Sequence, residues 1–117
     1  MSLHADFYHD ETGADALREL EALDNPESSA VGKLLGRMGA VMSQVSRRGT
    51  GAFYHAERWG QLYLVNVDDP PMYLFVRYAP DAATPWMVLM AGEGTGDNRE
   101  VQLTAMVRML ASKELRS

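Results

Sequence analysis

The spacing of apolar residues changes along the chain from a helical to an extended pattern. Over residues 26–47, apolar side chains recur every three or four positions and trace one face of a helix. These positions are Val31, Leu34, Leu35, Met38, Val41, Met42 and Val45. Asn25 and Pro26 suit the N-cap and the first helical position, and Gly49 suits the C-terminal stop. The pattern therefore predicts a long helix that ends near Arg47.

A strand and a shorter helix are predicted before this long helix. Residues 3–9 carry aromatic side chains in modest alternation, which favours a strand. The segment from Thr12 to Asp15 is similar to a helix-capping signal, and leucines follow it at positions 17, 20 and 23. We therefore expect a short helix over residues 13–24.

From residue 52 onwards the pattern becomes extended. Four stretches rich in aromatic and β-branched residues predict strands, at residues 53–58, 62–67, 72–79 and 86–91. The breaks between them have the length of hairpin turns, which predicts an antiparallel meander. Pro70 and Pro71 cannot donate hydrogen bonds to a sheet, so both are expected in a turn.

The last predicted element is a helix that follows a glycine-rich connection. Residues 92–96 read Gly-Glu-Gly-Thr-Gly, and residues 97–100 fit a capping box. Behind this box, one helical face carries Leu103, Met106, Val107 and Leu110. Lys113 and Arg116 suit the negative end of the helix dipole.

The predicted order of elements is β-α-α-β-β-β-β-α. This order favours an α+β fold of two layers, with an antiparallel meander, two N-terminal helices packed on one face and a C-terminal helix. Residues 1–117 show no internal repeat, linker or composition break. We therefore expect a single domain that spans residues 1–117.

Three glycines interrupt the long helix at Gly32, Gly36 and Gly39. Each destabilises a helix interior by about 1 kcal/mol relative to alanine. Their retention suggests a helix backbone that lies close to another element. Packing on the sheet is the favoured explanation, and a groove that pairs with another helix is the alternative.

Composition excludes several classes of protein. The chain has 117 residues and no cysteine, which rules out disulfides, thiolate metal sites and cysteine nucleophiles. No apolar run approaches the roughly 20 residues that a membrane helix needs. The first residues lack the basic and apolar regions of a secretory signal. A cytoplasmic protein without membrane contact is the expectation.

The charge distribution argues against a general affinity for nucleic acid. The net charge is −5, and phosphate binding depends mainly on lysine and arginine. Residues 28–58 nevertheless hold five basic residues and one acidic residue. The basic residues are Lys33, Arg37, Arg47, Arg48 and Arg58. A solvated helix face is the favoured interpretation of this stretch, and a local binding patch is the alternative.

The familiar cofactor, metal and hydrolase motifs are absent from the sequence. The dinucleotide fingerprint needs a glycine where Asp97 stands, and no P-loop sequence follows the glycine-rich connection. His4 and His9 would fall on opposite faces of a strand, so a metal site there is disfavoured. No Gly-x-Ser-x-Gly nucleophile elbow is present. We expect no cofactor and no metal.

One set of basic and aromatic residues has the side-chain types that metal-free RNA cleavage requires. It comprises Arg47, Arg48, Tyr54, His55, Arg58, Arg77 and Tyr78. Metal-free RNA cleavage needs a general base, a general acid and a cation that stabilises the phosphorane. His55 can act as base or acid, Arg58 and Arg77 can hold the phosphate, and the tyrosines can stack on a base. The alternative is that the arginines face solvent and the tyrosines cover the core.

The order of elements resembles that of the RelE/HigB/ParE superfamily of toxin–antitoxin toxins, over about residues 3–112. Three local segments add to this resemblance. Residues 48–58 are similar to the glycine-then-aromatic entry into the second strand of that family. The strand that contains Arg77 and the late apolar strand at residues 87–92 are similar to the family strands that follow.

The resemblance implies a toxin-like protein and leaves its mode of action open. Catalytic members carry lysine or arginine after the late strand, where this chain has its glycine-rich connection. The expected function is therefore a small cytoplasmic interaction protein that inhibits or regulates a macromolecular target by binding. Its partner would be a protein, either an antitoxin or a host target.

Two alternatives stay open beside that expectation. One is a metal-free endoribonuclease of RelE/HigB type that cleaves mRNA with His55, Arg58 and Arg77, with RNA as its partner. The other is a non-catalytic homodimeric accessory protein, of the kind found on a phage or another mobile element. The interface of such a homodimer would be its methionine-rich helix or an edge strand. For contact with RNA or with a protein partner, the candidate residues are Arg47, Arg48, Tyr54 and Tyr78.

Overall fold

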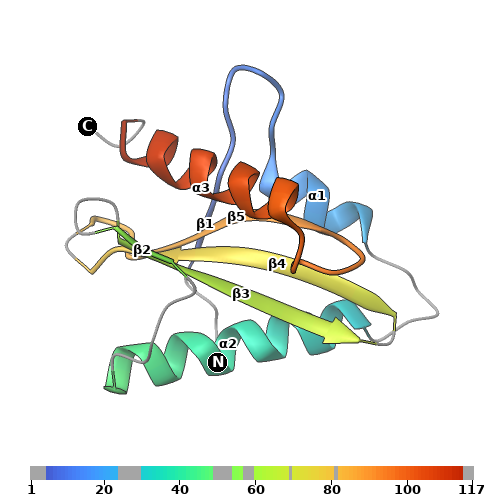
Figure 1. Ribbon diagram of the computed structural model, residues 1–117. Coiled ribbons are helices and arrows are strands. Elements are labelled where there is room, and N and C mark those ends of the chain that lie inside the picture. The colour runs from blue at the N-terminus through green and yellow to red at the C-terminus, as the bar shows by residue number, and fades with distance from the viewer. Residues whose placement is uncertain are drawn as a thin grey trace.

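The computed structural model describes residues 5–23, 30–48, 54–56, 60–68, 70–80 and 82–114. Its elements confirm the predicted order and the α+β class (Figure 1). They are β1 (Asp6–Phe7), α1 (Ala16–Ala22), α2 (Ala30–Arg48), β2 (Tyr54–Ala56), β3 (Gly60–Asp68), β4 (Pro71–Tyr78), β5 (Trp86–Glu93) and α3 (Arg99–Glu114).

The sheet has five strands in the order β1-β5-β4-β3-β2. Strands β2 to β5 form the predicted antiparallel meander, whereas β1 pairs with β5 in parallel and makes the sheet mixed. Pro71 is the first residue of β4, opposite Asp68, so its expected place in the turn is wrong. The first position of a strand tolerates a proline because the missing N–H does not interrupt the ladder.

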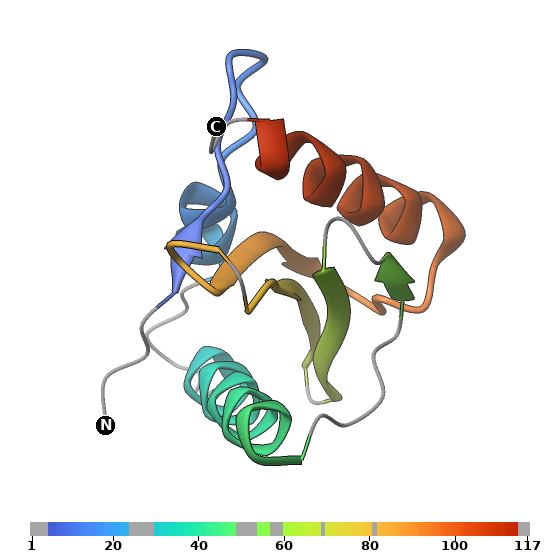
Figure 2. The ribbon, with the colours of Figure 1, turned by 90° about the vertical axis from the view of Figure 1, so that its left-hand side faces the viewer.

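Helices cover both faces of the sheet, so the predicted two-layer packing is wrong. Figures 1 and 2 show α2 on one face and α1 and α3 on the other. Every residue from Met72 to Arg77 in β4 is buried, as is every residue from Trp86 to Ala91 in β5. Because successive residues of a strand point to opposite faces, unbroken burial requires cover on both sides.

The long helix α2 packs on β3 and β4 through the face that its periodicity predicts. Leu34, Met38 and Val45 are buried, and the remaining apolar positions of that face are partly buried. The expected N-cap at Asn25 and the stop at Gly49 lie outside the described residues. The core on this side of the sheet is thus set by a local sequence pattern.

Two of the three glycines in α2 do not lie against the sheet. Gly32 and Gly36 are exposed, and a β-carbon built on either residue meets no atom within 4 Å. The explanation by sheet packing is therefore wrong for these two positions. Gly39 is half-buried.

Side-chain caps define where the two remaining helices begin. The carboxylate of Asp15 accepts a hydrogen bond from the Arg18 amide at the N-terminus of α1. Helix α1 is consequently shorter than predicted. At α3 the amide oxygen of Asn98 accepts from the Glu100 amide at 2.9 Å, which places the cap inside the predicted box. Among the described residues, no helix is long and apolar enough to cross a membrane.

Candidate functional site

Four of the predicted basic and aromatic residues lie on β2 and β4, on either side of β3, at one end of the sheet. Tyr54 of β2 pairs with Leu62 of β3, and Leu62 pairs with Arg77 of β4. His55 pairs with Gln61, which pairs with Tyr78. Since neighbouring strands lie about 4.8 Å apart, the backbones of β2 and β4 are roughly 10 Å apart. The register thus groups His55 with Tyr78, and Tyr54 with Arg77.

Arg77 lies in the interior of the protein, with 1% of its surface exposed. Its Nη1 donates to the Ser112 hydroxyl of α3 at 3.0 Å, and its Nη2 donates to the Thr84 carbonyl at 2.9 Å. The interpretation of Arg77 as a solvent-facing strand residue is therefore wrong. A buried guanidinium needs such internal acceptors, because leaving water without them is costly. Arg77 joins β4 to α3 and to the turn before β5.

Tyr78 lies on the opposite face of the sheet from Arg77, because consecutive strand residues alternate. Its ring centroid is 4.4 Å from that of Trp86, and the Trp86 ring is 6.1 Å from the Tyr63 ring. Rings at these distances stabilise each other beyond the area they bury. Tyr78 is half-buried in this aromatic group, which agrees with the interpretation of the tyrosines as cover for the core.

The other members of the predicted cluster are described only in part. Arg58 lies outside the described residues. The structure gives backbone positions alone for Arg47, Arg48, Tyr54 and His55. Convergence of His55, Arg58 and Arg77 on one phosphate therefore stays a prediction. The structure shows that the side chains of Arg77 and Tyr78 lie on opposite faces of the sheet.

A polar network that the sequence did not predict joins α1, α3 and β5. Arg108 of α3 donates two hydrogen bonds to the Glu19 carboxylate of α1, at 2.9 and 2.8 Å. The same guanidinium donates to the Leu89 carbonyl at 2.8 Å, and Glu19 accepts from the Ala91 amide at 3.2 Å. Leu89 lies at the register shift between β4 and β5. The ion pair thus bonds backbone groups of β5, one of which lies at this irregularity.

Tyr8, which is buried, and the partly exposed Asp10 extend this network. The Arg108 guanidinium carbon lies 5.6 Å from the centre of the Tyr8 ring, within cation–π range. The Tyr8 hydroxyl donates to Asp10 at 2.6 Å. Burial and this hydrogen bond raise the pKa of Tyr8 to about 12. Hydrogen bonds from Thr12 and Tyr8 lower the pKa of Asp10 to about 2. Both shifts move the pKa further from neutral pH, so Tyr8 stays protonated and Asp10 stays ionised.

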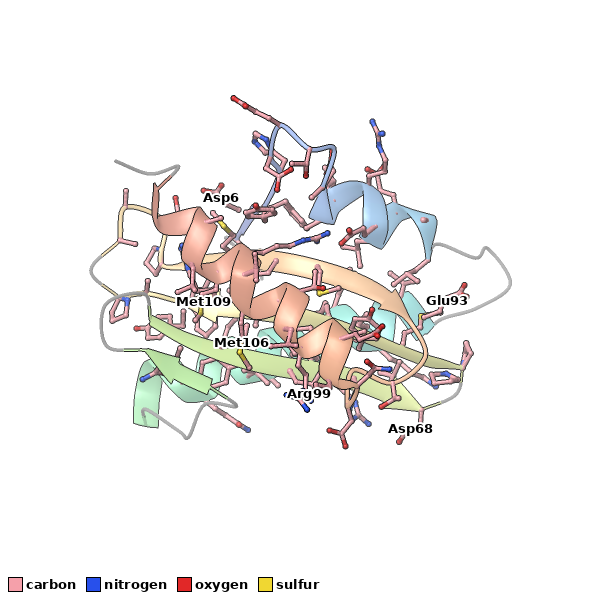
Figure 3. All side chains as sticks on the ribbon, turned by 45° about the horizontal axis from the view of Figure 1, so that its top comes forward. Asp6, Asp68, Glu93, Arg99, Met106 and Met109 are labelled. Carbon is pink, nitrogen blue, oxygen red and sulfur yellow. The ribbon has the colours of Figure 1, made fainter. Side chains whose placement is uncertain are left out.

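Helix α3 turns most of its predicted apolar face away from the sheet, although Met106 of that face is partly buried against the core. Its buried residues are Ala105, Met109 and Ser112. Figure 3 shows α3 crossing the front of the molecule, with Met106 and Met109 labelled on it.

The outward side of α3 carries a row of large aliphatic side chains. Leu103 is 50% exposed, Val107 63% and Leu110 40%. We call these three residues the α3 apolar row. Only one other large hydrophobic side chain is exposed among the described residues, Leu17 of α1. The spacing of the row, at positions i, i+4 and i+7, is that of the anchors of a helix bound to a partner.

Other kinds of site find no support among the described residues. No group of three or more histidine, aspartate or glutamate side chains there is placed to hold a metal ion.

No family model, curated protein or solved structure matches the chain. The features that bear on function are the exposed α3 apolar row and the burial of Arg77.

Proposed function

We propose that the protein acts by binding another protein through the α3 apolar row, without catalysis. The observation that carries this proposal is the exposure of Leu103, Val107 and Leu110 in a single line along one helix. Isolated exposed apolar residues are common, but a continuous row of them is typical of interaction surfaces. A polar row would serve solubility better if nothing were bound there.

The placement of Arg77 favours binding over RNA cleavage. A metal-free nuclease needs a cation that reaches the transferring phosphate. The Arg77 guanidinium is instead buried and bonded to Ser112 and to the Thr84 carbonyl. To contact a phosphate it would have to leave both acceptors. Arg77 joins β4 to α3 and to the turn before β5 through these hydrogen bonds, and this structural role accounts for its position without any contact to a substrate.

The sequence resemblance to RelE/HigB/ParE toxins supplies the class of target. On that basis the protein is a small toxin-like inhibitor or regulator in the cytoplasm, and its partner is an antitoxin or a host protein. The acidic composition is consistent with a protein target, since the chain carries a net charge of −5. Nucleic acid of the same sign would be repelled at long range.

Expression in a bacterial host with growth and affinity capture measured together tests this proposal. We expect growth to slow and a protein to be captured with the wild-type chain, and both effects to be lost with Val107→Glu. The control is Gln44→Glu, which adds the same charge at an exposed position of α2 on the other face of the sheet. Equal capture by wild type and Val107→Glu would refute the proposal.

RNA cleavage provides the complementary test. If the purified chain cuts RNA in the presence of EDTA and His55→Ala abolishes the cleavage, the endoribonuclease is the correct function and binding by the row is not. We expect no cleavage from either form.

A further inference from the structure

We propose that a second copy of this chain covers the α3 apolar row, with the two α3 helices antiparallel, until a target replaces it. This inference rests on the proposed function, because it takes the row to be a protein-binding surface. It adds the identity of one partner and a means of regulation: self-association competes with target binding for the same residues.

The spacing of the row makes it complementary to itself. Leu103 precedes Val107 by four residues, and Leu110 follows it by three. When two such helices lie antiparallel, Leu103 of one copy meets Leu110 of the other, and Val107 lies beside the two-fold axis. Closed dimers use the same patch on both subunits in this way. Helices with aliphatic contacts pack about 8–10 Å apart, and both rows then lose contact with water.

The charges at the ends of α3 agree with the same antiparallel register. The helix begins with Arg99 and Glu100, whose side chains are exposed, and its last two positions hold a lysine and a glutamate. In the register that pairs Leu103 with Leu110, position 99 lies opposite position 114 and position 100 opposite position 113. Each pair then combines an acidic with a basic residue. A parallel arrangement would place like charges opposite each other.

The opposition of the helix dipoles also favours the antiparallel arrangement. The positive N-terminus of each α3 would lie beside the negative C-terminus of the other. These arguments favour a second copy over an unrelated helix, because the complement of each charged position is present in the chain itself.

The size of the row indicates a weak dimer. Each partner of a standard interface buries about 800 Å², and three partly exposed side chains supply only a fraction of that area. We therefore expect a dissociation constant in the micromolar range. Such an affinity allows a tighter-binding target to displace the second copy.

Sedimentation equilibrium of the purified full chain over a wide dilution series tests the proposal. We expect the mass of the wild type to rise from monomer to dimer with concentration. Val107→Glu should stay monomeric at every concentration, whereas the control Gln44→Glu should match the wild type. A wild type that stays monomeric at every concentration, or a dimer that survives Val107→Glu, would overturn the proposal.

A charge swap tests the register with variants at the helix ends. Glu100→Lys should weaken the dimer several-fold, because it places two like charges opposite each other. Adding Lys113→Glu should restore the wild-type affinity, and high salt should reduce all of these differences. A dimer whose affinity is unchanged by Glu100→Lys, or not restored by the second change, would refute the antiparallel register.

The capture experiment separates this inference from the proposed function. If the chain is monomeric but still captures a protein that depends on Val107, the second copy is refuted and the binding function stands. If Val107→Glu changes neither mass nor capture, both proposals fail.

Discussion

Replacement of the exposed glycines of α2 by alanine should stabilise the protein. Gly32 and Gly36 lie inside a helix of 19 residues, are exposed to solvent, and have no atom within 4 Å of an added β-carbon. Neither has a positive φ angle, so alanine fits the backbone of both positions. The substitution therefore removes a flexibility that the folded state does not use.

The magnitude follows from helix propensity. Alanine is more favourable than glycine in a helix interior by about 1 kcal/mol, mainly because the unfolded chain loses fewer conformations. Gly36→Ala should thus raise the free energy of unfolding by about 1 kcal/mol, and Gly32→Ala with Gly36→Ala by about 2 kcal/mol. For a domain of this size, about 1 kcal/mol corresponds to a rise in melting temperature of roughly 4 °C.

Urea denaturation followed by far-ultraviolet circular dichroism measures this change. Gly92→Ala is the matched control, since its β-carbon would overlap the Tyr73 side chain and should lower stability. If Gly36→Ala lowers the midpoint or leaves it unchanged, the exposed helix face is in contact with something, and the reasoning is wrong. A helix partner seated on Gly32 and Gly36 would give that result.

The polar network of α1 and α3 gives two further predictions. Arg108→Met should lower the free energy of unfolding by about 2–3 kcal/mol, because it leaves the partly buried Glu19 carboxylate without its ion pair. The control Arg18→Met, at an exposed site, should change the free energy of unfolding by less than about 0.5 kcal/mol. Equal effects of the two substitutions in thermal denaturation would contradict the role of the ion pair. Asp10 has its pKa lowered from 3.8 to about 2 in the folded state, so its contribution to stability is complete above pH 3.8 and is lost as the pH falls towards 2. The stability difference between wild type and Asp10→Asn should therefore shrink over that interval in acid denaturation, and a constant difference would show that Asp10 does not titrate as described.

Elements with strong local patterns could be predicted, because the spacing of their apolar residues along the chain indicates which face will be buried. In α2, the apolar positions repeat over several turns, and the predicted face is the one that packs on the sheet. The meander was predictable for a similar reason, since short connections between extended segments permit few pairings. The number of layers was also encoded in the nearly unbroken apolar runs of β4 and β5, because a strand covered on both faces carries apolar residues at successive positions.

The candidate site shows where such reasoning stops. Leu103, Val107 and Leu110 were predicted to share a helical face, but their exposure was not foreseen. Arg108 and Ser112, on the opposite side of the same helix, bind partners in α1, β4 and β5. These tethers orient α3 so that its apolar row faces solvent. Arg77 was identified as important, but its burial under α3 could not be read from a strand pattern.

The sequence by itself determined the α+β class, the order of the elements and the inward face of α2, because these follow from periodicity and turn residues within a few positions of each other. Only the tertiary structure decided the layers, the orientation of α3 and the pairing of Glu19 with Arg108, which lie 89 residues apart. The physical reason is that a helix with two usable faces is oriented by the strongest contacts available to it. Here a bidentate ion pair, a hydrogen bond to the buried Arg77 guanidinium and the packing of Ala105 and Met109 hold the opposite side of α3 inward, and leave its aliphatic row exposed.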